Sequence, residues 1–183
     1  MFTHTQPDFR PHGGRDAPRK AKTLRPFRAK QPMHLVFRAS RARGAWSFLR
    51  KRNREGIEAL LERCAKRFSV RVLGEANVGN HIHLLVQARR KSDLQNFLRV
   101  FAQGVVFLVT GARKGRPVGK FWDALVFSRV VRWGREYSTM LRYIDKNRWE
   151  SAGMPRSRVD AWFRFFAGLR RGAKPWDSFA IST

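Results

Sequence analysis

The stretch Gly79-Asn80-His81-Ile82-His83-Leu84-Leu85-Val86 places two histidines one residue apart in an otherwise apolar run. Side chains alternate between the two faces of a β-strand, so His81 and His83 lie on one face and the alternate apolar residues lie on the other. The apolar face predicts a strand packed on a core. Two imidazoles on the opposite face can together hold one metal ion. The alternative is a polar outer face with two solvated histidines, and the spacing alone leaves both open.

Strands and helices are expected to alternate on either side of this stretch. The apolar pattern predicts strands over residues 34–38, 70–75, 81–88 and 121–131. It predicts helices through residues 57–68, from an N-cap at Ser92-Asp93 to about Gly111, and over 135–149. The order strand, helix, strand, strand, helix, strand, helix predicts an α+β fold of the ferredoxin-like type. In that fold one antiparallel sheet carries helices packed on it.

The charge balance points to a polyanionic partner. The 183 residues include 39 Lys and Arg against 13 Asp and Glu, a formal net charge of +26. Nucleic acid is the commonest partner of so basic a chain, and a ribosomal-type or merely adhesive basic protein is the alternative. The composition predicts a basic flexible arm over residues 1–32, one folded domain over 33–150 and a tail of basic and aromatic residues over 151–183.

The single cysteine, Cys64, excludes an internal disulfide and a cysteine zinc site, and it fits a reducing compartment. It falls on the apolar stripe of an expected helix, which predicts a core role. The longest apolar stretch, residues 105–109, is too short to cross a membrane, and the N-terminus lacks the apolar run of a secretory signal. We therefore expect a cytoplasmic protein with no membrane partner.

The last helix of the expected domain carries a second chemical pattern. Tyr143 and Asn147 are four residues apart, so they share one side of that helix. If this side meets the histidine pair, the asparagine oxygen is a third metal ligand and the tyrosine hydroxyl lies beside the metal. Such a group could cut a phosphodiester, with the metal polarising the phosphate and the phenolate attacking phosphorus. The alternative for Tyr143 is a half-buried packing residue.

Together these residues resemble the single-tyrosine HUH transposases, which include the insertion-sequence transposases and the REP-associated tyrosine transposases. The histidine stretch resembles their HUH motif, and Arg142-Tyr143-Ile144-Asp145-Lys146-Asn147 resembles their tyrosine helix. Phe121-Trp122 resembles an aromatic pair that opens the last strand in this family. The resemblance covers roughly residues 33–150, and the order of the expected elements also matches.

The resemblance implies a specific reaction. Family members bind single-stranded DNA folded into hairpins, nick it with the tyrosine and remain attached to the 5′ phosphate, and reversal on another strand joins the ends. Carried over, His81, His83 and Asn147 are metal ligands and Tyr143 is the nucleophile. The metal is Mg²⁺ or Mn²⁺, and two imidazoles favour Mn²⁺ on chemical grounds. Members act as monomers or homodimers, and a bacterial, nucleoid-associated location is implied.

Basic and aromatic residues outside these motifs are candidates for DNA contact. Each basic candidate has a solvated charge as its alternative. The candidates for phosphate contact are Arg41, Arg43, Arg50, Lys51, Arg52, Arg113, Lys114 and Arg116. Trp46, Trp162 and Trp176 are candidates for base stacking or, equally, for packing.

Three more residues have polar or titratable side chains near the expected motifs. His34 is expected to have a structural role, with a place near the site as the alternative. Asp123 and Glu136 are expected to form ion pairs, with a role as auxiliary acids as the alternative.

Three functions compete on these grounds: a metal-dependent tyrosine nickase and strand transferase, a descendant that binds hairpins without cutting, and an unrelated RNA-binding module. The third predicts aromatic residues on the central strands, where this sequence has histidines. The first two differ only in whether the catalytic site is complete.

Overall fold

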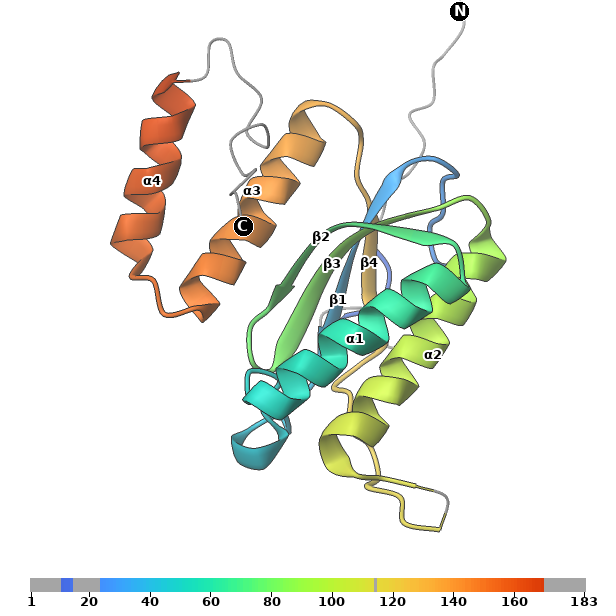
Figure 1. Cartoon of the computed structure of the whole chain (residues 1–183). Coiled ribbons are helices and arrows are strands. Elements are labelled where there is room, and N and C mark those ends of the chain that lie inside the picture. The colour runs from blue at the N-terminus through green and yellow to red at the C-terminus, as the bar shows by residue number, and fades with distance from the viewer. Residues whose placement is uncertain (1–10, 15–23, 114, 170–183) are drawn as a thin grey trace, which may run out of the picture.

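A computed structural model describes residues 11–14, 24–113 and 115–169. Within these residues, four strands form one antiparallel sheet in the order β2-β3-β1-β4. The strands are β1 (Pro32–Arg38), β2 (Val70–Asn77), β3 (His81–Ala88) and β4 (Phe127–Val130). The helices are α1 (Lys51–Arg67), α2 (Lys91–Thr110), α3 (Arg135–Ser151) and α4 (Arg156–Leu169), with a short 3₁₀ helix η1 (Gly44–Trp46). The α+β, ferredoxin-like prediction is confirmed (Figure 1).

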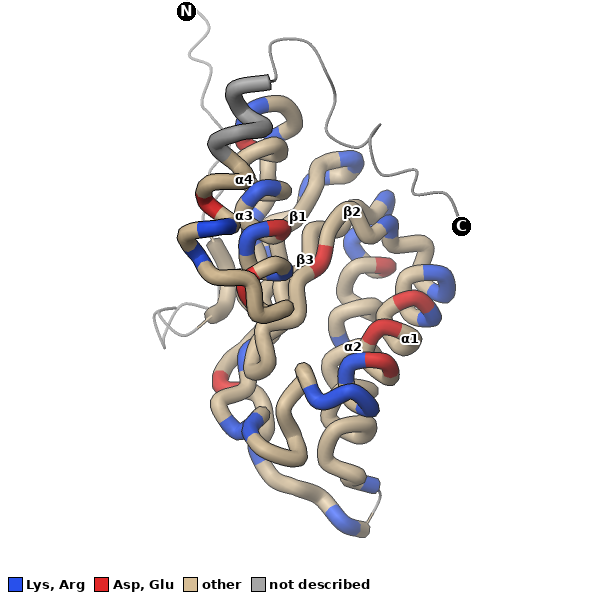
Figure 2. Tube along the Cα trace, turned by 60° about the vertical axis from the view of Figure 1, so that its left-hand side comes forward, with Lys and Arg blue, Asp and Glu red and all other residues tan. Residues whose placement is uncertain are grey.

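The sheet lies between two layers of helices. Helices α1 and α2 cover one face, and α3 lies on the other, with α4 beside α3 (Figures 1 and 2). The larger core lies under α1 and α2 and includes Leu35, Leu84 and Phe101, all fully buried. A smaller core lies under α3 and is formed by Ala76, Leu85, Val131 and Ile144. The side of β3 that carries the histidines therefore faces the α3 layer.

Helix α3 can approach the sheet closely because of an irregularity in β2. The pairing of β2 with β3 shifts register between Val72 and Gly74, as at a β-bulge. A Cβ atom at Gly74 would lie 3.2 Å from a methyl carbon of Leu141 on α3 and 3.7 Å from one of Ile144. The missing side chain at this position leaves room for the helix.

Several predicted boundaries differ from those of the structure, among them the starts of β1 at Pro32 and of α1 at Lys51. The strand expected over 121–131 is confined to Phe127–Val130, because Phe121 is buried in the larger core and Trp122 packs against it with its indole N–H bonded to the carbonyl of Ala102. Helix α2 begins at Lys91 with Arg90 as its N-cap residue, rather than at Ser92-Asp93. Asp93 lies in the first turn instead, where its carboxylate pairs with Arg90.

The segments that flank the central domain also contain structure. In the expected arm, His12 exchanges two backbone hydrogen bonds with Ser128 of β4, and Arg25 donates to the carbonyl of Val126 and the hydroxyl of Ser128. In the expected tail, α4 was not predicted from the sequence. The described helices include none that is both long and apolar enough to cross a membrane.

Candidate active site between the sheet and α3

Three histidines from two neighbouring strands meet on the sheet face that α3 partly covers. His81 and His83 lie on the same side of β3, with ring centroids 4.8 Å apart. His34 comes from β1, where it pairs with Leu85 and is thus a diagonal neighbour of His83. The His34 and His83 rings are parallel, 5° apart in orientation, with centroids 5.4 Å apart. The sequence placed the first two residues on one face, and the structure adds the third.

Each histidine of the β3 pair is held at its Nδ1 atom. His83 Nδ1 lies 3.1 Å from His34 Nε2, and both residues are buried, with 4% and 6% of their surfaces exposed. His81 Nδ1 lies 2.7 Å from the side-chain oxygen of Asn80, to which it donates its hydrogen. An imidazole that donates from Nδ1 keeps a lone pair on Nε2. His81 is thus held in the tautomer that can bind a metal.

The second ring nitrogen of His83 makes no hydrogen bond with the described residues. Its Nε2 atom is buried and has no hydrogen-bond partner among the described residues. Buried polar atoms almost always have partners, so such an atom commonly marks a place where an ion, water or substrate binds. This orphaned atom and the free Nε2 of His81 fit a metal held between the two rings.

Burial keeps these rings neutral at physiological pH. Burial, with smaller contributions from the neighbouring rings of His34 and His81, lowers the pKa of His83 to about 3. Burial lowers the pKa of His34 to about 4, with a smaller effect from Arg129. The pKa of His81 is also lowered, by burial and by Arg38. Neutral imidazole is the form that binds metals, so no proton has to be displaced from these rings.

Tyr143 lies against the histidine cluster from the α3 side. Its ring is 5.4 Å from that of His83 and 6.1 Å from that of His34, both edge-on. The next residue on the helix, Ile144, is fully buried in the smaller core and holds α3 in place. Tyr143 itself is 45% exposed. A ring that touches the histidines while remaining open to solvent is accessible to a large substrate.

Asn147 lies one helical turn beyond Tyr143. Its amide nitrogen donates to the carbonyl of Tyr143 at 2.7 Å, which fixes the amide and directs its other end, the oxygen, away from that carbonyl. Helix α3 runs opposite to β3, because Ile144 lies near Gly74, the partner of Leu85, and Arg148 bonds to the carbonyl of Glu75, the partner of Leu84. The direction along α3 from Tyr143 to Asn147 is therefore the direction along β3 from His83 to His81.

The nitrogen donors that the structure brings together here are the rings of His81 and His83. Among the residues that the structure describes, no group of three or more His, Cys, Asp and Glu side chains is arranged to hold a metal. The side-chain oxygen of Asn147 is the third donor that the sequence led us to expect. Imidazole and amide donors are neutral, so a divalent ion held by them would keep its full charge toward an anionic substrate.

The two carboxylates considered as auxiliary acids are engaged in ion pairs, as the sequence led us to expect. Asp123 accepts hydrogen bonds from the backbone and hydroxyl of Ser40 and lies 3.5 Å from the guanidinium of Arg38. Glu136, in the first turn of α3, pairs with Arg129 of β4 and accepts from the backbone of Arg132 at 3.0 Å. These contacts hold the loop before β4 and the start of α3.

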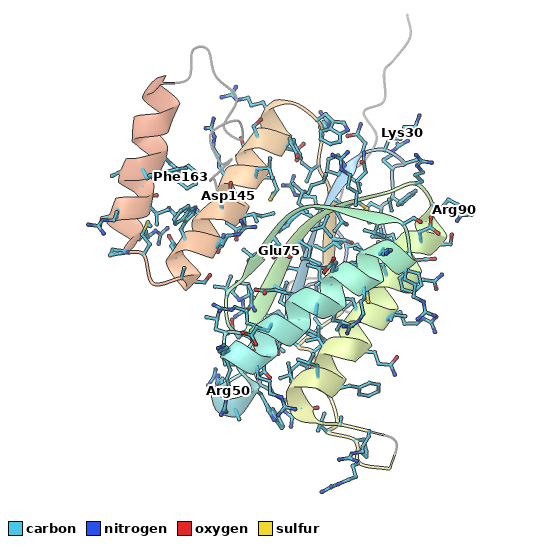
Figure 3. The ribbon with its side chains drawn as sticks, viewed as in Figure 1. Lys30, Arg50, Glu75, Arg90, Asp145 and Phe163 are labelled. Atoms are coloured by element: carbon cyan, nitrogen blue, oxygen red, sulfur yellow. The ribbon has the colours of Figure 1, made fainter. Side chains whose placement is uncertain are left out.

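The basic candidates lie near the end of the sheet where β3 begins. Figure 3 shows Arg50 at this end of α1, far from Arg90 at the start of α2. Backbone bonds from Ala39 to Asn80 and from Phe48 to Gly79 join the η1 region to the turn before His81. Exposed basic side chains lie on three segments near this end (Figure 2). They are Arg43, Arg50, Lys51, Arg52, Arg113 and Arg116, while Lys114 lies outside the described residues.

Arg41 differs from the other basic candidates. Its guanidinium donates to the carbonyls of Val118 and Lys120 at 2.7 and 2.8 Å, and it lies over the ring of Trp46. Its contacts therefore fix the loop between α2 and β4. Of the stacking candidates, Trp46 packs on Phe121 and Trp162 on Trp149, and Trp176 lies outside the described residues.

The sequence offered a place near the site for His34 only as an alternative, and it gave no role to Asn80. The alternation in β1 puts His34 on the face opposite Met33 and Leu35, but nothing in the sequence gives the register that brings it to His83. Asn80 precedes the histidine pair in a turn, and its role as acceptor from His81 depends on the turn conformation, in which Gly79 has a φ of 91°.

Comparison with known proteins reveals similarity in structure alone. Neither protein-family models nor curated proteins match the sequence. A structure described as a REP-associated tyrosine transposase bound to a REP hairpin matches 85% of this chain and 88% of its own, with a TM-score of 0.55 and 13% identity. A protein described as "a putative transposase from Deinococcus radiodurans" matches 69% of this chain and 98% of its own, with a TM-score of 0.42 and 14% identity.

The first of these two structures has the same fold as this chain. At 13% identity the likeness concerns the fold, and it agrees with the family resemblance that the histidine and tyrosine motifs suggest.

Proposed function

We propose that this protein nicks and rejoins single-stranded DNA at hairpin-forming repeats, using Tyr143 as nucleophile and a divalent metal held by His81, His83 and Asn147. The observation that carries the proposal is the contact of the Tyr143 ring with His83, whose outward nitrogen is buried and unpartnered among the described residues. A packing tyrosine would not need to lie half exposed beside such an atom. The shared fold with a hairpin-bound transposase supports the same proposal.

The chemistry follows from the positions of the side chains. The Tyr143 oxygen attacks the phosphorus, a bond forms between them, and the bond from phosphorus to the 3′ oxygen breaks. The 3′ oxygen leaves as a hydroxyl after taking up a proton, and the tyrosine proton passes to solvent, which reaches this exposed residue. The product is a 5′-phosphotyrosine and a free 3′ hydroxyl, and reversal with another 3′ hydroxyl joins strands.

The protein's own residues would hold and orient the metal. His81 and His83 would bind through Nε2 and Asn147 through its side-chain oxygen. The metal, Mg²⁺ or by preference Mn²⁺, would polarise the scissile phosphate and favour the ionised phenol. Because all three proposed ligands are neutral, no ligand carboxylate would reduce the attraction of the metal for a phosphate.

The exposed cations near the histidine end of the sheet support DNA as the substrate. They lie on both sides of η1 and on the loop after α2, and backbone bonds join the η1 region to the turn that leads to His81. A hairpin stem presents phosphates that such residues neutralise. We propose that the stem lies on this basic end while the unpaired strand enters between α3 and the sheet.

A covalent-adduct assay tests the proposal. Hairpin oligonucleotides from palindromes that flank the gene, labelled at the 3′ end, are incubated with protein and Mn²⁺ and separated under denaturing conditions. Wild type is expected to carry the label, because the downstream fragment remains on Tyr143. Tyr143→Phe is expected to form no adduct, while Tyr137→Phe, which changes the chain's other tyrosine on the same helix, forms it normally.

Two other results have clear meanings. An adduct that persists in Tyr143→Phe would show that another residue is the nucleophile and would refute the proposal. Tight hairpin binding by wild type with no adduct under any metal would favour the alternative, a hairpin-binding protein without cleavage activity.

A further inference from the structure

We infer that His34 is a positioning residue that accepts a hydrogen bond from Nδ1 of His83 and thereby holds His83 in the tautomer whose Nε2 binds the metal. The inference rests on the proposed function for the metal itself, but the tautomer is a property of the metal-free protein. His34 comes from a different strand than His81 and His83, and its Nε2 atom is engaged with Nδ1 of His83.

The geometry requires one hydrogen to be shared between the two rings. His34 Nε2 and His83 Nδ1 are 3.1 Å apart, and two neutral imidazoles form such a bond only if one ring donates and the other accepts. If His34 donated, the hydrogen of His83 would have to be on Nε2. That atom is buried and has no acceptor among the described residues, so it would be an unsatisfied donor and unable to bind a metal.

In the opposite arrangement, the lone pair of His83 is on Nε2, where a cation can bind it. When His83 donates to His34, its Nε2 presents an unprotonated nitrogen to the site. His81 reaches the same state through a different partner, the side-chain oxygen of Asn80. Metal-binding histidines typically donate their second N–H to an oxygen acceptor. Here one of the two uses a histidine instead, and this choice adds no negative charge next to the metal.

The surroundings fix the His34 ring for this role. It is 6% exposed, lies parallel to His83 and meets Phe127 and Tyr143 edge-on at centroid distances of 5.9 and 6.1 Å. A ring held on three sides cannot turn its Nε2 away from His83 without displacing these neighbours. The β1–β3 register, which sets His34 opposite Leu85, determines the diagonal approach.

Two substitutions separate hydrogen bonding from packing. His34→Gln keeps an amide oxygen near the position of Nε2, whereas His34→Leu fills similar space without an acceptor. The first measurement is the ring ¹⁵N spectrum of metal-free protein with labelled histidine, with the signals assigned by single substitutions among the five histidines. We expect the His83 hydrogen on Nδ1 in wild type and His34→Gln, and a substantial Nε2–H population in His34→Leu.

The second measurement is Mn²⁺ affinity by electron paramagnetic resonance. We expect His34→Leu to bind Mn²⁺ about 10–100-fold more weakly than wild type, the usual effect of losing such a partner. His34→Gln is expected to remain close to wild type. The inference is overturned if wild-type His83 carries its hydrogen on Nε2, or if the Leu and Gln variants change the tautomer and affinity equally. Absence of Mn²⁺ binding in wild type would contradict the proposed function, while the spectrum would still decide the tautomer.

Discussion

The rings of His81 and His83 lie 4.8 Å apart on one face of β3, inclined at 74°, and each is held by a different part of the fold. Asn80, in the turn before the strand, bonds to His81, while His34, on the neighbouring strand, bonds to His83. The two proposed ligands are therefore oriented independently. A change at one of them should leave the other in place.

Substitution of His81 by alanine should separate cleavage from binding. His81 is half buried at the start of β3, so its removal leaves the core intact while one metal ligand is lost. We expect adduct formation to fall by more than about 100-fold, beyond the effect of losing an outer partner of a ligand. The dissociation constant for the hairpin, measured by fluorescence anisotropy, should change little.

The matched control for His81 is Gln87→Ala. Gln87 lies on the same face of the same strand, where it bonds to the carbonyl of Lys30, so the variant alters the strand without touching the site. It should cut normally. If His81→Ala lost binding and cleavage to the same extent, the histidines would be structural.

Substitution of Arg52 and of Arg41 should have different consequences. Arg52 is exposed in the first turn of α1, and no hydrogen bond or ion pair occupies it in the described structure, so it is free to meet phosphate. Arg52→Ala should weaken hairpin binding. It should also reduce, by about 1, the magnitude of the slope of log K against the logarithm of the salt concentration. Arg41→Ala should lower the melting temperature instead, because Arg41 holds the carbonyls of Val118 and Lys120. A lower salt slope with unchanged stability for Arg41→Ala would contradict this division.

The sequence predicted those features that depend on local periodicity. The alternation in residues 81–88 gave the two faces of β3, and helical spacing put Tyr143 beside the buried Ile144. Both follow from the geometry of one element. The same reasoning was wrong at Phe121 and Trp122, where apolar residues that resemble a strand instead fill the core beside α2.

Features that depend on contacts between distant segments were not predictable. His34 meets His83 because β1 and β3 pair in one particular register, which is set by the whole core. Arg41 was predicted to contact DNA because its charge and neighbours are typical of a basic surface. Its bonds to residues 118–120 arise only when the loop folds back, about eighty residues along the chain.

The stability of the metal-free protein should fall in mild acid. Burial lowers the pKa of His83 to about 3 and that of His34 to about 4, below the 6.5 of an exposed histidine. As the pH falls, the unfolded chain binds protons first, so the stability present above about pH 6.5 is lost toward pH 4. Between pH 7 and 5 each residue should remove about 2 kcal/mol from the free energy of unfolding.

Urea unfolding in EDTA at a series of pH values measures this loss. The double variant His34→Gln, His83→Gln removes both titrating groups and should show a much flatter dependence over the same range. An equally steep fall in the double variant would assign the acid sensitivity to other residues.

The smaller core should control the placement of the tyrosine. Ile144 is fully buried under α3, next to Tyr143, in a cluster that otherwise contains Ala76, Leu85 and Val131. Ile144→Val should cost about 0.5–1.5 kcal/mol and Ile144→Ala about 2–5 kcal/mol. Since α3 carries both Tyr143 and Asn147, adduct formation should fall more than hairpin binding, which we assign to the opposite layer and its loops.

Ile57 offers the matched control for this prediction. It is buried to a similar degree, at 3% exposed, but lies on α1 in the larger core. Ile57→Val makes the same chemical change and should lower stability without slowing the cleavage by folded protein. Amide hydrogen exchange should rise in α3 for the Ile144 variants and in α1 for Ile57→Val. If both positions reduced cleavage equally at matched stability, α3 would not be a separately held support for the nucleophile, and the tyrosine's position would depend on the fold as a whole.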